Sequence, residues 1–141
     1  MASLSKKRIF VDADAFVALA KSDDQNHARA TKALDRLVAQ GAHFLTSNYV
    51  FAEAVTVLSL RVSHQTAVEF MQMLRDPQGG IQILWVNEEI ELKAMAIFQE
   101  QRSKNVSFMD CCHMSCVDAH RLDAIFSFDH IYVQNKIPVV N

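Results

Sequence analysis

Short runs of consecutive apolar residues alternate along the chain with longer segments in which apolar residues recur at helical spacing. The short runs predict five strands, at 8–12, 43–47, 81–86, 123–129 and 137–140. In the first of them the apolar residues follow one another without alternation, so we expect that strand to be buried on both faces.

The longer segments predict helices at 15–20, 26–41, 48–62, 64–76, 87–104 and 107–121. Asn48 is a candidate N-cap for one of them, and Ser107 and Asp110 stand at capping-box spacing at the start of another. Strands that alternate with helices indicate a parallel sheet covered on both faces. The pattern therefore predicts a three-layer α/β/α sandwich around a mostly parallel sheet of about five strands, in a single domain spanning residues 1–141.

The composition narrows the class of protein. The 141 residues are half apolar and include only three glycines and two prolines, which is typical of a compact, helix-rich fold. The net charge of −2 excludes a broad basic surface for nucleic acid, so any such contact needs a local patch or metal ions. Candidate phosphate contacts are Lys6, Lys7, Arg102, Lys104 and Arg121.

Three cysteines stand close together in "CCHMSC" and do not resemble a spaced disulfide framework, which favours a reducing cytoplasm. Neither a membrane span nor a signal peptide is expected from the apolar runs. Cys112, Cys116 and His120 share a helical face, but two turns separate Cys112 from His120 by about 12 Å. We therefore expect a small apolar core role for the cysteines and no zinc site.

Four acidic residues are predicted to converge on one edge of the sheet. Asp12 ends the first strand and Asp129 ends the fourth, while Glu53 lies in the helix after the second strand. Asp110 lies in the first turn of the helix that leads into the fourth strand. In parallel α/β folds ligands bind beyond the carboxyl ends of the strands.

Carboxylates that share one cleft repel each other and demand a cation. Oxygen-only ligation favours Mg²⁺ or Mn²⁺ over Zn²⁺. Taken one at a time, Asp12 is also explained as a turn or cap residue and Asp110 as a helix cap. Glu53 carries more weight, because it interrupts the apolar helix "VFAEAVTV", where a charge is rarely buried without a partner.

Four motifs in order resemble the PIN-domain family, and within it the VapC-type toxin ribonucleases. They are "IFVDADAF", "TSNYVFAEAV", "VSFMDCCHMS" and "AIFSFDHIY", and the likeness runs from about residue 8 to 140. The resemblance implies a metal-dependent endoribonuclease with Asp12, Glu53, Asp110 and Asp129 as metal ligands and Ser127 as a further catalytic residue. It also implies Mg²⁺ or Mn²⁺, an RNA substrate cut to 5′-phosphate and 3′-hydroxyl ends, a small antitoxin partner and a homodimer.

One position departs from the family pattern. Asp14 stands where the family commonly has Ser, Thr or Asn. Its role stays open between the metal shell and a cap of the following helix.

Other classes of function remain open at this point. "RIFVDADAF" also resembles the strand end of haloacid-dehalogenase-type phosphatases, with Asp12 as nucleophile and Asp14 as acid/base, although no Gly-Asp loop follows. A receiver-like domain needs an acceptor aspartate after the third strand, where Asn87 stands. A PIN-like scaffold that binds RNA or protein without cutting is the third alternative.

Overall fold

A central sheet of five parallel strands organises the molecule. The structure is a computed structural model, and it describes residues 5–141. The strands are β1 (Arg8–Val11), β2 (His43–Ser47), β3 (Ile81–Leu84), β4 (Ala124–Phe126) and β5 (Val139–Val140), in the spatial order β3-β2-β1-β4-β5. Every neighbouring pair is parallel, so the mostly parallel sheet of the sequence prediction is confirmed and is in fact parallel throughout.

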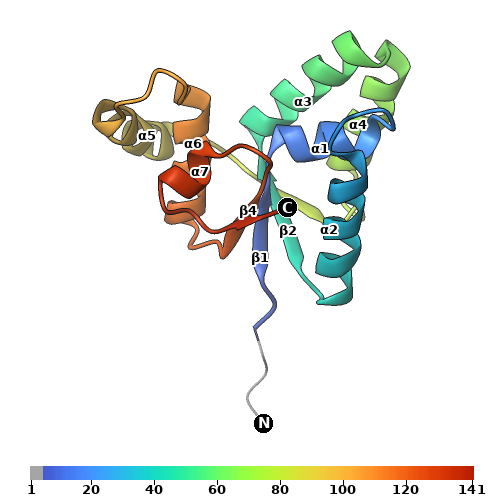
Figure 1. The fold of residues 1–141 in the computed structure, drawn as a ribbon, viewed down its shortest axis with the longest axis horizontal. Coiled ribbons are helices and arrows are strands. Elements are labelled where there is room, and N and C mark those ends of the chain that lie inside the picture. Colours follow the sequence, from blue (N-terminus) through green and yellow to red (C-terminus); the bar gives the residue numbers. More distant parts are fainter. Residues whose placement is uncertain (1–4) are drawn as a thin grey trace.

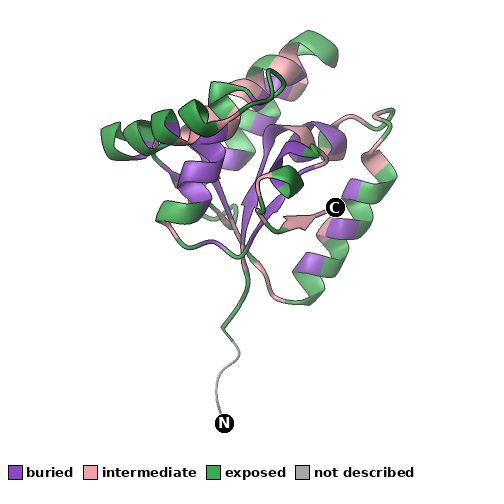
Figure 2. Cartoon of the chain, turned by 60° about the vertical axis from the view of Figure 1, so that its left-hand side comes forward, coloured by how far each residue is buried: buried purple, intermediate pink, exposed green. Residues whose placement is uncertain are grey.

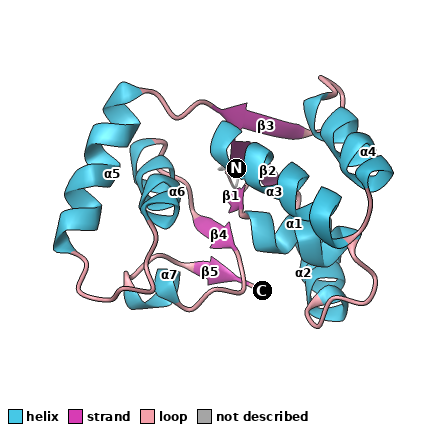
Figure 3. Ribbon diagram, turned by 90° about the horizontal axis from the view of Figure 1, so that it is seen from above, coloured by secondary structure: helices cyan, strands magenta, loops and turns pink. Residues whose placement is uncertain are grey.

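Helices cover both faces of the sheet. One layer holds α1 (Ala13–Ala20), α2 (His27–Ala39), α3 (Asn48–Arg61) and α4 (His64–Arg75), and the other holds α5 (Glu88–Glu100), α6 (Phe108–Ala119) and α7 (Ile131–Gln134). The two layers stand on either side of the strands in the front view and in the view from above (Figure 1, Figure 3). This is the predicted three-layer sandwich.

The core lies where the strands and the inner helix faces meet (Figure 2). On β1, Ile9 and Phe10 have no exposed surface, as expected for a strand covered on both faces. On α6, every residue from Cys111 to Val117 is buried. Small side chains in this stretch let α6 lie between α5 and the sheet, and they include the three cysteines, which are buried as predicted.

Some boundaries differ from the sequence prediction. β4 ends at Phe126, so Asp129 stands in the following loop and not at the end of a strand. The cap of α3 is Ser47, whose hydroxyl accepts the N–H of Val50, whereas Asn48 instead accepts the N–H of Val86 across the sheet edge. The short helix α7 was not predicted, because four residues carry no periodic signal.

The strand order changes direction beside β1. The chain moves outward from β1 through β2 to β3, and then returns to place β4 on the other side of β1. In the register, Val11 pairs with Phe126, so the carboxyl ends of β1 and β4 lie together. Such a switch point leaves a crevice between the diverging loops, which is where parallel α/β folds bind ligands.

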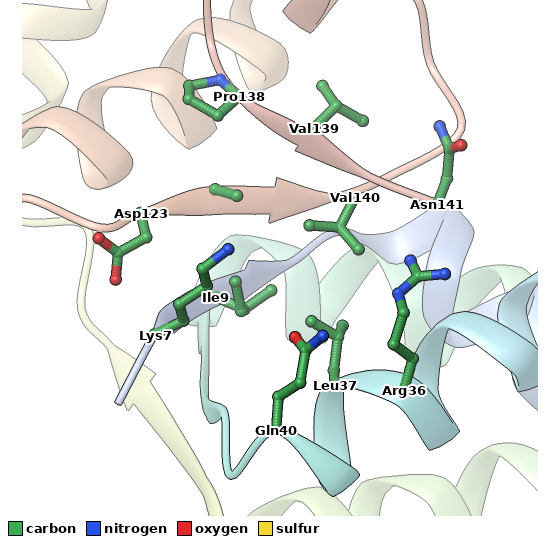
Figure 4. A pocket seen from close by; sticks show the side chains of 11 residues that line it. Lys7, Ile9, Arg36, Leu37, Gln40, Asp123, Pro138, Val139, Val140 and Asn141 are labelled. Carbon is green, nitrogen blue, oxygen red and sulfur yellow. The ribbon is translucent and has the colours of Figure 1, made fainter. Parts of the chain in front are cut away.

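A cleft of about 540 Å³ opens elsewhere, between the end of α2 and the strands β1, β4 and β5 (Figure 4). Lys7, Arg36 and Asp123 line it, and none of the carboxylates predicted for the site does. Among the helices of residues 5–141, none has both the length and the apolar character required to cross a membrane.

Candidate metal centre

Asp12 stands at the carboxyl end of β1, where it also caps α1. Its Oδ1 accepts the N–H of Ala13 at 2.7 Å, and its own N–H donates to the carbonyl of Phe126 on β4 at 3.1 Å. The side chain is buried, with 7% of the residue exposed. The cap interpretation and the site interpretation of Asp12 are therefore both compatible with the geometry.

Asp14 and Ser127 join Asp12 from across the switch point. The Oδ2 of Asp14 accepts the N–H of Phe128 at 2.7 Å and lies 3.0 Å from the Ser127 hydroxyl. The same hydroxyl lies 3.2 Å from Asp12 Oδ2, so a single proton serves two carboxylates. The other oxygen of Asp14, Oδ1, is buried and has no hydrogen-bond partner among the described residues.

Asp110 enters from the first turn of α6. Its Oδ2 accepts the N–H of Ser107 at 2.8 Å while the Ser107 hydroxyl accepts the N–H of Asp110 at 3.0 Å, which completes the predicted capping box. The remaining oxygen, Oδ1, faces the hydroxyl of Tyr132 at 3.5 Å. The capping box thus fixes one carboxylate oxygen and leaves the other directed at the site.

Two buried side chains that the sequence prediction missed complete the cluster. Tyr132 donates its hydroxyl to Asp12 Oδ2 at 2.9 Å. His113 places Nδ1 at 3.1 Å from that hydroxyl and 3.3 Å from Asp12 Oδ1. His113 stands three residues after Asp110, on the same face of α6, and this spacing was a usable signal. Tyr132 had none, because α7 is too short to show a face.

The other two predicted acids lie at the rim. Glu53 is half-buried on α3, and one of its carboxylate oxygens falls in a group with Asp12 and His113 whose ligand atoms all lie within 4.8 Å of one another. Asp129 is exposed, and its Oδ1 accepts the N–H of Ile131 at 3.0 Å. The backbone N–H of Asp129 donates to Ser127 at 3.2 Å, so this residue adjoins the cluster through its main chain.

Three of these carboxylates, those of Asp12, Asp14 and Glu53, have pKa values above their ordinary range. Burial raises the pKa of Asp12 to about 6, against the opposing effect of its hydrogen bonds. Burial and the charge of Asp12 raise the pKa of Asp14 to about 7. Burial and the charges of the neighbouring aspartates raise the pKa of Glu53 to about 7 as well. Burial lowers the pKa of His113 to about 4, so its ring is neutral at physiological pH and does not compensate these charges.

The donor set fits a divalent metal ion. Two ligands that share one Mg²⁺ at about 2.1 Å lie no more than about 4.2 Å apart. The nearest carboxylate oxygens of Asp12 and Glu53 lie within 4.8 Å of each other, only slightly farther apart than that, and Asp14 adds a buried oxygen without a partner. Repelling carboxylates with raised pKa values are the chemistry that a bound cation relieves.

A cleft of about 290 Å³ opens beside these carboxylates, between α1, α3 and the loop that precedes α2. Asp14 and Glu53 line one part of it, and Asn26 and Arg61 also contribute. Arg61 is the one cation among the described residues that line this cleft.

The basic residues proposed from the sequence are divided between the two ends of the parallel strands. Lys7 precedes Asp12 by five residues of extended chain, about 16 Å. It therefore stands at the amino ends of the strands, on the side opposite Asp12. Lys6 adjoins Lys7 in the chain, and Arg121 lies between α6 and β4, also at the amino ends of the strands. Arg102 and Lys104 lie in the loop before α6 and so on the side of Asp110.

The cysteines of α6 are buried and protonated thiols. Burial raises the pKa of Cys112 to about 11 and that of Cys116 to about 12. Without a metal these buried thiols keep their protons, in keeping with the apolar core role expected of them.

Comparison with known proteins gives a family and a fold. The sequence model of the family described as PIN domain matches residues 9–137. VapC20 from Mycobacterium tuberculosis, described as a toxin that cleaves the sarcin-ricin loop, superposes with a TM-score of 0.79 at 23% identity, covering 92% of this chain and 95% of that one. No curated protein matches the sequence.

Two further solved structures share the fold. A toxin–antitoxin complex from Klebsiella pneumoniae gives a TM-score of 0.67, and FitAcB from Neisseria gonorrhoeae gives 0.68. Each is 16% identical to this chain, and each comparison covers 94% of this chain and 96% of the other.

Proposed function

Because the chain belongs to the PIN-domain family, we propose that it is a metal-dependent endoribonuclease and the toxin of a toxin–antitoxin pair. The observation that carries the proposal is the cluster at the β1–β4 switch point, where Asp12, Asp14 and Glu53 all have raised pKa values and none forms a salt bridge with a described lysine or arginine. The likeness to VapC20 supports the choice of RNA as substrate.

In this proposal Asp12, Glu53 and Asp110 hold the ion, and Asp129 adds a ligand at the rim. When bound, Mg²⁺ or Mn²⁺ activates water and neutralises charge on the phosphoryl oxygens. Ser127 orients Asp12 through its hydroxyl. Asp14 anchors the loop after β4 by accepting the N–H of Phe128.

We assign the cleft beside Glu53 to the RNA strand, with Arg61 as a phosphate contact. A single arginine gives weak, salt-sensitive binding, in keeping with a net charge of −2. We expect 5′-phosphate and 3′-hydroxyl products, released in the cytoplasm. The proposed partners are a small antitoxin protein and a second copy of the chain, and the Klebsiella pneumoniae complex supports the former.

An RNA cleavage assay tests the function. Wild-type protein is incubated with end-labelled ribosomal RNA in Mn²⁺ or in EDTA, beside Asp12→Asn and the control Asp35→Asn, which changes an exposed aspartate on α2. We expect Mn²⁺-dependent cleavage by wild type and Asp35→Asn, and a loss of at least about 100-fold in Asp12→Asn. Equal cleavage by Asp12→Asn refutes the nuclease. A folded wild type that binds RNA without cutting it favours the scaffold.

The phosphatase alternative has a separate signature. A nucleophilic Asp12 forms a phosphoaspartyl intermediate, which acid-quenched mass spectrometry detects. We expect none, because family membership favours a nuclease and Asp14, the required acid/base, is held against Phe128 and Ser127.

A further inference from the structure

A completely buried tyrosine lies between two of the clustered carboxylates. Tyr132 has no exposed surface although its helix, α7, is only four residues long. A buried phenolic hydroxyl requires a partner. Here the hydroxyl donates to Asp12 Oδ2 at 2.9 Å and lies 3.5 Å from Asp110 Oδ1.

His113 stands behind that hydroxyl and sets its direction. Its ring is 1% exposed and packs against the ring of Phe10, with the centroids 5.7 Å apart. Nδ1 lies 3.1 Å from the Tyr132 oxygen and 3.3 Å from Asp12 Oδ1, and because both neighbours accept hydrogen bonds we assign the ring proton to Nδ1, which leaves the phenolic proton directed toward Asp12. Nε2 then carries a lone pair, in agreement with its lack of a described partner, because buried orphan acceptors are commoner than buried orphan donors.

The hydroxyl joins parts of the chain that are distant in sequence. Tyr132 follows Asp12 by 120 residues and Asp110 by 22. The two carboxylates repel each other across the switch point, and the tyrosine proton offsets that repulsion on Asp12. Because a phenylalanine ring would fill the same space, packing alone does not explain the buried hydroxyl.

We propose that Tyr132, oriented by His113, is a positioning residue that holds Asp12 and Asp110 at the spacing required to bind the divalent ion. The proposal rests on the metal-dependent function proposed above. It assigns to Tyr132 and His113 no contact with the ion or with RNA. Outer residues of this kind typically contribute 10–100-fold to metal affinity.

The chain supplies its own matched control. Its two tyrosines are Tyr132 and Tyr49, and the hydroxyl of Tyr49 lies 3.1 Å from Glu91 Oε2, which is not one of the clustered carboxylates. The experiment measures Mn²⁺ affinity by calorimetry for wild type, Tyr132→Phe and Tyr49→Phe, with melting in EDTA to establish that each is folded. We expect Tyr132→Phe to bind Mn²⁺ about 10–100-fold more weakly and Tyr49→Phe to match wild type. The Mn²⁺ concentration that gives half-maximal cleavage shifts in parallel.

The role of His113 is tested by a double-mutant cycle. His113→Leu is measured alone and combined with Tyr132→Phe. If His113 acts through the tyrosine, the double variant binds Mn²⁺ no more weakly than Tyr132→Phe. If the double variant binds Mn²⁺ more weakly than Tyr132→Phe, His113 acts on the ion directly as a ligand. That result refutes its role in orienting Tyr132. If Tyr132→Phe does not fold, the measurement on His113→Leu decides. A His113→Leu variant that binds Mn²⁺ as tightly as wild type overturns the proposal.

The two proposals fail in different ways. A folded wild type that takes up no Mn²⁺ refutes the metal centre itself. A wild type that binds Mn²⁺, beside a folded Tyr132→Phe of equal affinity, refutes only the positioning role.

Discussion

Asp14 accepts the backbone N–H of Phe128 at 2.7 Å, which ties the first turn of α1 to the loop that follows β4. The two residues are 114 positions apart. The sequence left the role of Asp14 open, and this contact shows that the carboxylate fixes the loop carrying Ser127 and Asp129.

The Asp14 contact gives a prediction on stability. Asp14→Ala leaves the half-buried N–H of Phe128 without its acceptor, which costs about 1–3 kcal/mol. Asp14→Asn retains an acceptor oxygen and removes the repulsion from Asp12, so we expect stability equal to or above that of wild type. Urea unfolding in EDTA at pH 8 measures both variants. Identical midpoints for the two would contradict this role.

The raised carboxylate pKa values predict that the metal-free protein loses stability as the pH rises. In the folded state Asp12, Asp14 and Glu53 have pKa values of about 6, 7 and 7, above their ordinary values of 3.8, 3.8 and 4.5. Between about pH 4 and 7 these three carboxylates bind more protons in the folded state, which outweighs the opposite effect of His113 with its lowered pKa of about 4, so the free energy of unfolding falls as the pH rises. We expect a Tm in EDTA about 5 °C or more lower at pH 8 than at pH 5.

Mn²⁺ provides the converse measurement. The ion binds deprotonated carboxylates, so saturating Mn²⁺ raises the Tm more at pH 8 than at pH 5. Asp12→Asn serves as the control, with a shallower pH slope and a smaller response to the ion. A Tm in EDTA that increases steadily from pH 5 to pH 8 would exclude this account.

The capping box of α6 is predicted to act on function as well as on stability. Ser107→Ala removes the cap from the N–H of Asp110 and costs about 1 kcal/mol. Ser63→Ala removes the equivalent cap of α4, where the hydroxyl accepts the N–H of Thr66 at 3.0 Å, and costs a similar amount. Only Ser107→Ala loosens Asp110, so only this variant should bind Mn²⁺ more weakly. Equal Mn²⁺ affinity in both variants would show that the Ser107 cap does not position Asp110 for metal binding.

The two possible roles of Asp129 are separated by a pair of substitutions. Asp129→Asn keeps an oxygen for the N–H of Ile131, whereas Asp129→Ala does not. If Asp129 is a metal ligand, as we propose, both variants lose most RNA cleavage at saturating Mn²⁺. Cleavage retained in Asp129→Asn would restrict this residue to accepting the N–H of Ile131 at the start of α7.

The sequence by itself determined the order of the helices and strands. It also placed most of the acidic residues at the carboxyl ends of the strands. Apolar runs and helical spacing are local signals, and they placed Asp12 at the end of β1 and Asp110 in the first turn of α6. The capping box of Ser107 was visible for the same reason, because its partners are three residues apart.

Only the tertiary structure decided which side chains surround those acids. β4 lies beside β1 and not beside β3, and this strand order brings Ser127 and Tyr132 onto Asp12 across 115 and 120 residues. No periodicity encodes a contact over that distance. The raised pKa values follow from the same cause, since the loss of water around a carboxylate is a property of the assembled fold and not of its neighbours in the chain.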